Sequence, residues 1–179
     1  MAAAAAEVVV VSDDDETEVV PKPKKKAAPT ESKSEIVFYL LDSIAFPDAS
    51  YMGKSTRGLD KRLEEHNAGR KKTSYTYKLR PLRPVAYVTG FQTNLQVCQF
   101  EIACKRRVVA AGDCRTKIHR AIKRIMGVMF QEKWMEHSEP AAGVPLVLHV
   151  CSTYAPLVEK RWIDALPSHV AVHLHKLHN

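Results

Sequence analysis

The order of short apolar segments between residues 36 and 105 constrains the fold more than any other feature. "IVFYLLD" at 36–42 is a compact apolar and aromatic run, which is typical of a buried strand. A loop containing Pro47 separates it from a second short strand that ends at "SYMG", so the two are expected to pair as a hairpin. "VAYVTGF" at 85–91 predicts a third strand.

Two helices are predicted around that third strand. The first covers about 58–67 and stops before Gly69, because four residues follow helical spacing: Leu59, Arg62, Leu63 and His66. The second is expected to be capped by Asn94 and to run past Lys105, with three residues at i, i+3 and i+7 facing the core: Leu95, Cys98 and Ile102.

The remaining chain is predicted to be mostly helical. One helix is indicated by an apolar stripe made of Ile118, Ile122, Ile125 and Met129. "PLVLHV" favours a last strand, and a short helix is expected near "APLVEKRWIDAL". The predicted fold is α+β: a small, three-stranded, mainly antiparallel sheet flanked by helices, with a mostly helical C-terminal extension. The expected divisions are a tail at 1–33, a domain at 34–110 and the extension at 111–179.

Charge is distributed unevenly along the chain. Residues 1–30 contain six acidic and four basic side chains, so the remaining chain carries a net charge of +9. A basic folded part favours a polyanionic partner such as nucleic acid. The first thirty residues lack a helical or strand period and are expected to be disordered. Within them, "PKPKKK" is either a nuclear import signal or a solvated charge run, so the nucleus is the expected location, with the cytoplasm as the alternative.

Several classes of site are disfavoured by spacing. The segment "GKST" at 53–56 lacks the P-loop's opening glycine, because the required position is Asp48, so no nucleotide cofactor is expected. The four cysteines show neither a C-x-x-C pair nor a zinc spacing with histidine, and are predicted to be free thiols. No segment is long and apolar enough to predict a membrane span.

Six segments, taken in order, resemble the GIY-YIG nuclease domain over residues 36–110: "VFYLLD", "YMGKST", "LDKRLEEHN", "TSYTYKLRP", "VAYVTGF" and "FEIACKR". Within that superfamily the sequence is most similar to the catalytic subunit of the eukaryotic Slx-type structure-specific endonuclease. The sequence departs from these patterns in three ways: Val37 stands at the usual first glycine, one residue more than usual separates Gly53 from Arg62, and the cysteine pattern of a RING-like module is missing. A scaffold protein subunit is therefore a possible partner; the alternatives are that the chain cuts branched DNA alone or uses a different partner surface.

The resemblance implies a catalytic set and a metal. The expected catalytic residues are Tyr39, Tyr51, Arg62 and His66. Counting residues from the glycine would select Lys61 as the family arginine position, whereas the helical phase selects Arg62, which lies one turn before His66. Glu101 is the expected ligand of Mg²⁺ or Mn²⁺. Nearby cations are expected to favour the Tyr39 phenolate and make it a usable base. His66 is expected to bond a phosphate oxygen or the attacking water, or to act as a helix cap.

The partner implied by the resemblance is DNA, with branched DNA expected because nothing resembles a base-reading helix. The candidate DNA-binding residues mix cations with aromatic rings, which suits backbone contact and stacking: Lys54, Arg70, Lys71, Lys72, Tyr75, Lys78 and Arg80. The predicted function is a metal-dependent, structure-selective DNA endonuclease acting in repair or recombination. The alternatives are a catalytically inactive nucleic-acid-binding module of the same fold, and a basic interaction module unrelated to nucleases.

Overall fold

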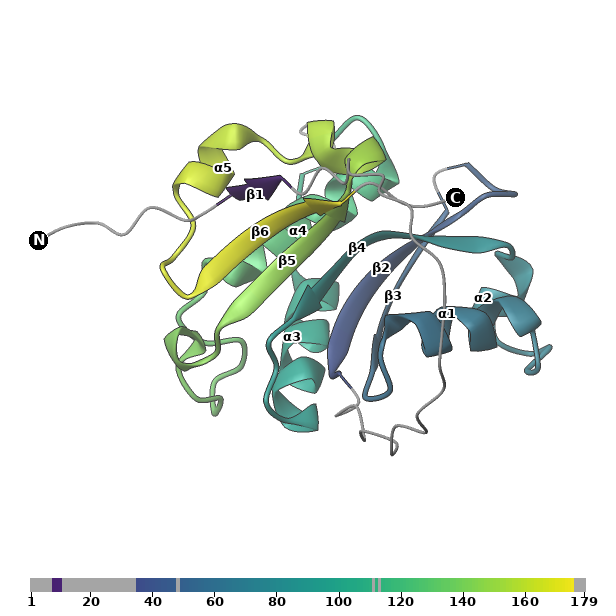
Figure 1. The fold of residues 1–179 in the computed structure, drawn as a ribbon, viewed down its shortest axis with the longest axis horizontal. Helices are drawn as coiled ribbons and strands as arrows, with labels where there is room; N and C mark the ends of the chain where they lie inside the picture. Colours follow the sequence, from purple (N-terminus) through teal and green to yellow (C-terminus); the bar gives the residue numbers. More distant parts are fainter. Residues whose placement is uncertain (1–7, 11–34, 48, 111, 113, 176–179) are drawn as a thin grey trace, which may run out of the picture.

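Strands rich in Val, Leu and aromatic residues assemble into one sheet in the computed structural model, which describes residues 8–10, 35–47, 49–110, 112 and 114–175. The strand order is β1-β6-β5-β4-β2-β3 (Figure 1). The strands are β1 (Val8–Val10), β2 (Val37–Ser43), β3 (Ser50–Ser55), β4 (Leu82–Thr89), β5 (Leu146–Cys151) and β6 (Val170–His175). The helices are α1 (Leu59–Ala68), α2 (Tyr75–Lys78), α3 (Asn94–Arg106), α4 (Lys117–Met129) and α5 (Lys160–Asp164), with short 3-10 turns η2 (Ala141–Gly143) and η3 (Ser152–Leu157).

The α+β class is confirmed, but the sheet is larger than the predicted three strands. β2 pairs antiparallel with β3, as the hairpin prediction requires, and on its other side with β4. β5 extends the sheet antiparallel to β4. β6 then adds parallel to β5, and β1 adds parallel to β6. Besides its helices, the C-terminal part therefore contributes two of the six strands, of which only β5 was predicted.

β6 escaped prediction because its sequence, "VAVHLH", places histidines where an apolar run would be expected. β1 lies within the tail that was expected to be disordered, so that prediction is wrong for Val8–Val10. The rest of residues 1–33, which includes "PKPKKK", lies outside the described residues, so the prediction of disorder there stays a prediction.

The two faces of the sheet bury different clusters. One face carries Phe38 and Leu40 of β2 against α3 and α4, where Phe100 and Met126 are fully buried. The other face carries Val37, Tyr39 and Leu41, packed against Leu59 and Leu63 of α1. Successive strand residues point to opposite faces, so β2 is buried on both sides. Figure 1 shows α3 and α4 along one side of the sheet, with α1 and α2 at the end that carries β2 and β3.

Helix α3 has a different phase from the one predicted. Its buried residues are Val97, Phe100, Ala103 and Cys104, whereas Leu95 and Ile102 are exposed. Its N-cap is Thr93 and not Asn94, because Thr93 and Gln96 form a reciprocal capping box. Glu101 still lies at the edge of the buried face, next to Phe100.

Two other sequence-based expectations concern the cysteines and the membrane. All four cysteines are free; Cys104 and Cys151 are buried, while Cys98 and Cys114 are half-buried. Among the helices of the described residues, none combines the length and the apolar character that crossing a bilayer requires.

Candidate active site

The site is built on a close approach between Tyr39 and Gly53. These residues are register partners on β2 and β3. The Tyr39 ring lies across Gly53 so closely that a Cβ at that position would be 2.6 Å from the phenol oxygen. Glycine is needed here because any side chain would displace the phenol. Gly53, Lys54 and Ser55 belong to a β-strand, so "GKST" is not the phosphate-binding loop of a P-loop protein.

Helix α1 brings two residues to the Tyr39 hydroxyl. His66 Nε2 lies 3.0 Å from the Tyr39 oxygen, and Arg62 Nε donates to that oxygen at 3.4 Å. The two residues lie one helical turn apart on the same face. Lys61 is exposed, so the helical phase, and not the residue count, identified the side chain that contacts Tyr39. Glu65 holds the Arg62 guanidinium at 2.9 Å.

Both ring nitrogens of His66 are engaged within the protein. Nε2 contacts Tyr39, and Nδ1 lies 3.1 Å from Thr76 Oγ1. Thr76 in turn contacts the Ser74 hydroxyl at 3.0 Å, and Ser74 caps α2 by accepting from the Tyr77 backbone N–H. The expectation that His66 bonds phosphate or water directly does not fit this geometry, because its nitrogens are occupied. Burial lowers the pKa of His66, which favours the neutral ring.

The pKa of Tyr39 moves in the direction opposite to the one expected. Burial raises it to about 12, and the hydrogen bond from Arg62 opposes that rise without overcoming it. Tyr39 is 1% exposed, so loss of solvation outweighs the single guanidinium beside it. The phenol is therefore protonated at neutral pH.

Glu101 lies on α3, which packs on the opposite side of β2 and β3 from α1. Its carboxylate accepts from Lys105 at 2.6 Å, and its side chain is 16% exposed. Its charge also contributes, as the smallest of the causes, to the raised pKa of Tyr39. β3 is the edge strand of the sheet, and its Lys54 contacts Asn94 at the start of α3, the helix that carries Glu101. One half-buried carboxylate suits a mostly hydrated Mg²⁺, which typically binds protein through one or two such groups.

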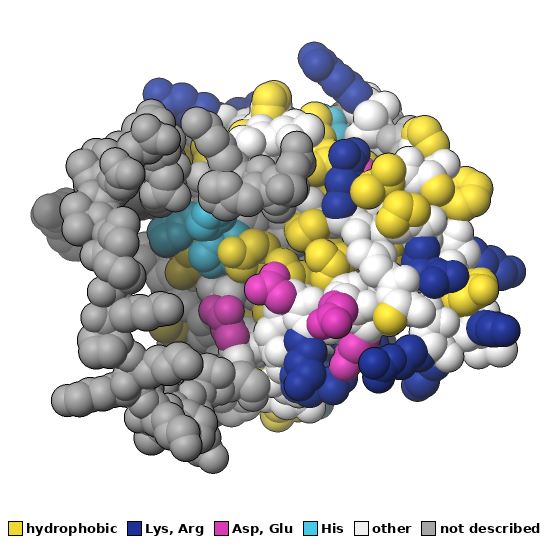
Figure 2. Space-filling model, turned by 45° about the vertical axis from the view of Figure 1, so that its right-hand side comes forward, with side chains coloured by type: hydrophobic (Ala, Val, Ile, Leu, Met, Phe, Trp, Pro, Cys, Tyr) yellow, Lys and Arg dark blue, Asp and Glu magenta, His cyan; other side chains and the backbone are white. Residues whose placement is uncertain are grey.

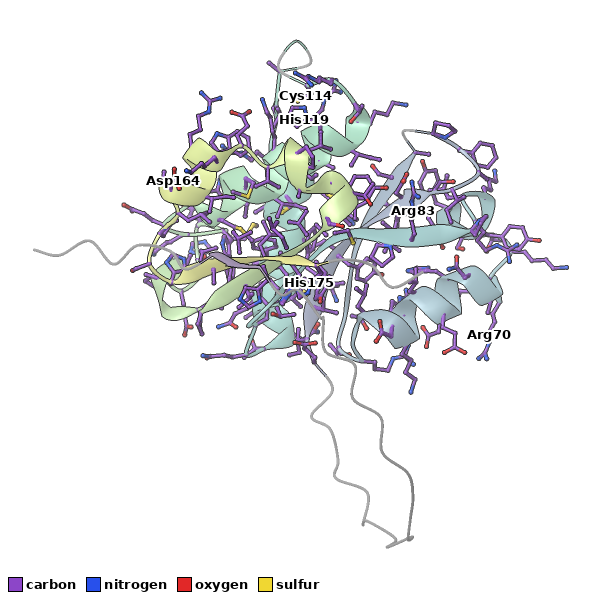
Figure 3. All side chains as sticks on the ribbon, turned by 45° about the horizontal axis from the view of Figure 1, so that its top comes forward. Arg70, Arg83, Cys114, His119, Asp164 and His175 are labelled. Carbon is purple, nitrogen blue, oxygen red and sulfur yellow. The ribbon has the colours of Figure 1, made fainter. Side chains whose placement is uncertain are left out.

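A cavity of about 400 Å³ opens beside the Tyr39 hydroxyl partners. Tyr51, Arg62 and His66 line it from β3 and α1, and Tyr51 approaches the His66 ring edge-on at 5.4 Å between centroids. Arg70 and Tyr75 also line the cavity, and Tyr75 is 61% exposed. Figure 3 shows Arg70 at the end of α1, extending away from the sheet. The cavity thus joins the predicted catalytic residues to part of the predicted DNA-binding set.

The other predicted DNA-binding residues are distributed around this cavity. Lys71 lines it, and Lys72 and Lys78 are exposed nearby in the chain. Lys54 donates to Asn94 at 3.3 Å, at the start of α3. Figure 2 shows Lys and Arg side chains spread over the end of the molecule that carries α1 and α2, with apolar side chains between them.

Arg80 has a structural role. Its guanidinium donates to the backbone carbonyls of Tyr77 and Asn67 and lies 4.0 Å from the centre of the Tyr77 ring. It also occupies the space beside Gly69, which ends α1 in the left-handed conformation at φ 64°.

The geometry agrees with a comparison against known families. Residues 36–110 match the GIY-YIG catalytic domain. This region therefore has a nuclease-type fold, and domains of this family are generally endonucleases that bind DNA and use divalent metal ions. No curated protein matches the chain.

Sequence reasoning missed the hydroxyl pair that orients His66. Ser74 and Thr76 lie in "TSYT", a hydroxyl-rich stretch whose surrounding lysines and arginines indicate a DNA-binding loop. The signal that could have found their role is the place of Ser74 just before a short helical turn, because serine there commonly caps a helix.

Proposed function

We propose that the protein is a metal-dependent, structure-selective DNA endonuclease that hydrolyses phosphodiester bonds in branched DNA such as flaps, forks and junctions, with a role in repair or recombination. One observation carries the proposal: the Tyr39 hydroxyl is held between Arg62 and His66, beside a cavity that Arg62, Arg70 and Lys71 line. The match to the nuclease family supports it.

In the proposed mechanism, Tyr39 relays a proton and does not act as a preformed phenolate. A guanidinium can only donate, so Arg62 occupies a lone pair of the Tyr39 oxygen and leaves its O–H to donate to His66 Nε2. As water attacks the phosphorus, Tyr39 takes the water proton on its oxygen and passes its own proton to His66. Neutral His66 is ready to accept it, and the imidazolium then donates from Nδ1 to Thr76.

Arg62 and the metal ion would stabilise the negative charge on the phosphate. The guanidinium stays charged and offers a planar fork to the non-bridging phosphate oxygens, in competition with Glu65. Glu101 would hold Mg²⁺ or Mn²⁺, for which Lys105 must release the carboxylate. A bound ion would supply electrostatic stabilisation of the extra negative charge in the transition state and of the leaving 3′ oxygen.

Substrate selection rests on shape and charge in this proposal. Arg70 and Lys71 line the cavity and can contact the phosphate backbone, while the exposed Tyr75 ring offers a stacking platform for an unpaired base. Unpaired or splayed bases occur at flaps, forks and junctions, and not within a plain duplex. The arrangement therefore favours branched DNA over duplex DNA.

The similarity to the Slx-type catalytic subunit belongs to the same proposal. A scaffold protein is a candidate partner, although the chain lacks the RING-like cysteine pattern. Nuclear localisation rests on "PKPKKK".

The alternative is an inactive module that binds branched DNA without cutting it. The full chain should be incubated with a flap, a fork, a four-way junction and a duplex, with and without Mg²⁺, alongside Tyr39→Phe. We expect Mg²⁺-dependent cleavage of a branched substrate by the wild type, and a large loss in Tyr39→Phe. Tight binding without cleavage would favour the inactive module. Cleavage only after a scaffold protein is added would make the partner obligatory.

A further inference from the structure

Three imidazoles gather on the sheet at a distance from the candidate nuclease centre. His149 and His173 are register partners on β5 and β6, and His175 lies two residues further along β6, on the same face. Tyr39, Tyr87, His149 and His173 follow one another in register across four neighbouring strands. The cluster thus shares a face with Tyr39 but lies two strands away, on β5 and β6. Figure 2 shows imidazoles grouped beside apolar side chains, and Figure 3 labels His175 near the middle of the fold.

We propose that His149, His173 and His175 form a Zn²⁺ site. Their ligand nitrogens all lie within 4.8 Å of one another, and His149 Nδ1 is 2.7 Å from His175 Nε2. Tetrahedral Zn²⁺ with bonds of about 2.0–2.1 Å separates its ligand atoms by about 3.4 Å. The observed spacings bracket that value, so small side-chain adjustments would complete three bonds.

The surroundings hold the rings in place. Thr89 Oγ1 lies 3.0 Å from His149 Nε2, which ties that nitrogen to the protein and leaves Nδ1 facing the cluster. Such a second hydrogen bond commonly orients metal-binding histidines. The Tyr87 ring stacks on His149 at 4.3 Å with an interplanar angle of 4°, and His173 meets His149 edge-on at 89°. His149 and His175 lie closer to parallel, with centroids 4.9 Å apart and an interplanar angle of 25°. Ring contacts therefore hold the three imidazoles beside one another.

A cavity of about 500 Å³ adjoins the cluster. His175 and Tyr87 line it together with two carboxylates and two cations, so charges of both signs face this side of the cluster: Glu35, Asp60, Arg57 and Lys61.

The donor set selects the kind of metal. Three neutral imidazoles suit Zn²⁺ and related transition ions and are poor ligands for Mg²⁺, which prefers oxygen. The site is therefore chemically separate from the Mg²⁺ or Mn²⁺ proposed at Glu101. A bound Zn²⁺ would join β5 to β6 and stabilise the C-terminal strand of the sheet, with a fourth position left for water.

The test measures binding directly and does not depend on nuclease activity. Untagged full chain is stripped with EDTA, and Zn²⁺ is titrated in competition with a chromophoric chelator. We expect one equivalent of Zn²⁺ per chain, a higher unfolding temperature with Zn²⁺, and no displacement by a large excess of Mg²⁺. Absence of stoichiometric Zn²⁺ binding by the wild type would overturn the proposal.

Variants locate the site. His173→Gln is the main variant, because His173 takes part in neither the His149–His175 contact nor the His149–Thr89 contact. The variant should weaken Zn²⁺ binding at least tenfold. Its unfolding temperature without metal should stay near that of the wild type. Thr89→Val should weaken binding by about 10- to 100-fold because the orienting bond to His149 is removed. His137→Gln, an exposed histidine outside the cluster, and Glu101→Gln should bind Zn²⁺ as the wild type does. Wild-type affinity in both His173→Gln and Thr89→Val would refute the assignment.

Discussion

Replacing Gly53 with alanine would place a methyl group where the Tyr39 ring lies. The new Cβ would be 2.6 Å from the phenol oxygen, and ordinary contact begins at 3.4 Å, so the hydroxyl would have to retreat by about 0.8 Å. That movement disrupts its 3.0 Å contact with His66. A displacement of about 1 Å at a reacting group can cost about 100-fold in rate, while overpacking of this kind typically costs about 1–3 kcal/mol of stability.

Gly53→Ala is therefore expected to stay folded and to bind branched DNA, yet to cleave about 100-fold more slowly than the wild type. The assay is single-turnover cleavage of a labelled fork or flap in Mg²⁺, with unfolding followed by circular dichroism. Gly143→Ala is the matched control, since a Cβ there meets nothing within 4 Å. Cleavage by Gly53→Ala within a few-fold of the control would refute the argument that the close approach positions Tyr39.

Three further predictions concern charge. Glu101→Gln keeps size and shape but removes the anionic ligand, so cleavage should fall by orders of magnitude while metal-free affinity for branched DNA stays equal or rises slightly, measured by fluorescence anisotropy. Neutralising Arg70, Lys71 and Lys72 together should reduce the slope of log K against log salt by about 0.9 for each phosphate that the variant no longer neutralises. Burial lowers the pKa of His66 from its usual value of 6.5. The stability that the neutral His66 ring contributes is therefore present above pH 6.5 and is lost as the pH falls through the pKa of the folded state. Cleavage should fall over the same acidic range.

Each of these has an outcome that would contradict it. Near-normal cleavage by Glu101→Gln would remove it as the metal ligand. An unchanged salt slope would place the DNA footprint away from the loop after α1. A pH–rate profile in which wild type and His66→Gln share the same acidic limb would show that His66 is not the titrating group.

The local pattern predicted which α1 residues lie beside Tyr39 better than it predicted the sheet. Helical spacing places Arg62 and His66 together, and the structure brings both to Tyr39. Spacing could not give the pKa of Tyr39, because burial depends on α1 packing over β2 and not on neighbours in sequence. The same limit applies to Thr76, whose contact with His66 depends on how the loop after α1 folds back.

The additional strands depended on pairing between distant segments. In β6, Val170 and Val172 face the core and the histidines lie on the other face. A search for continuous runs of apolar residues misses a strand of this kind. The phase of α3 was predicted wrongly for a related reason. Leu95 and Ile102 are apolar but exposed, and only the position of Phe38 across the core shows that Phe100 faces inward.

The pairing of β4 with β5 has a consequence for how the protein can be divided. Residues 36–110, which match the nuclease family, end before α4 and β5, yet β5 hydrogen-bonds to β4 along residues 86–89. Tyr154, from beyond that boundary, donates to buried Asp42 at 2.6 Å. A fragment cut at residue 110 would leave β4 as an open edge strand and would uncover part of the apolar side of β2. An open edge strand is a template for pairing with other chains. We therefore expect the excised fragment to self-associate, whereas expression through His175 should keep the sheet complete.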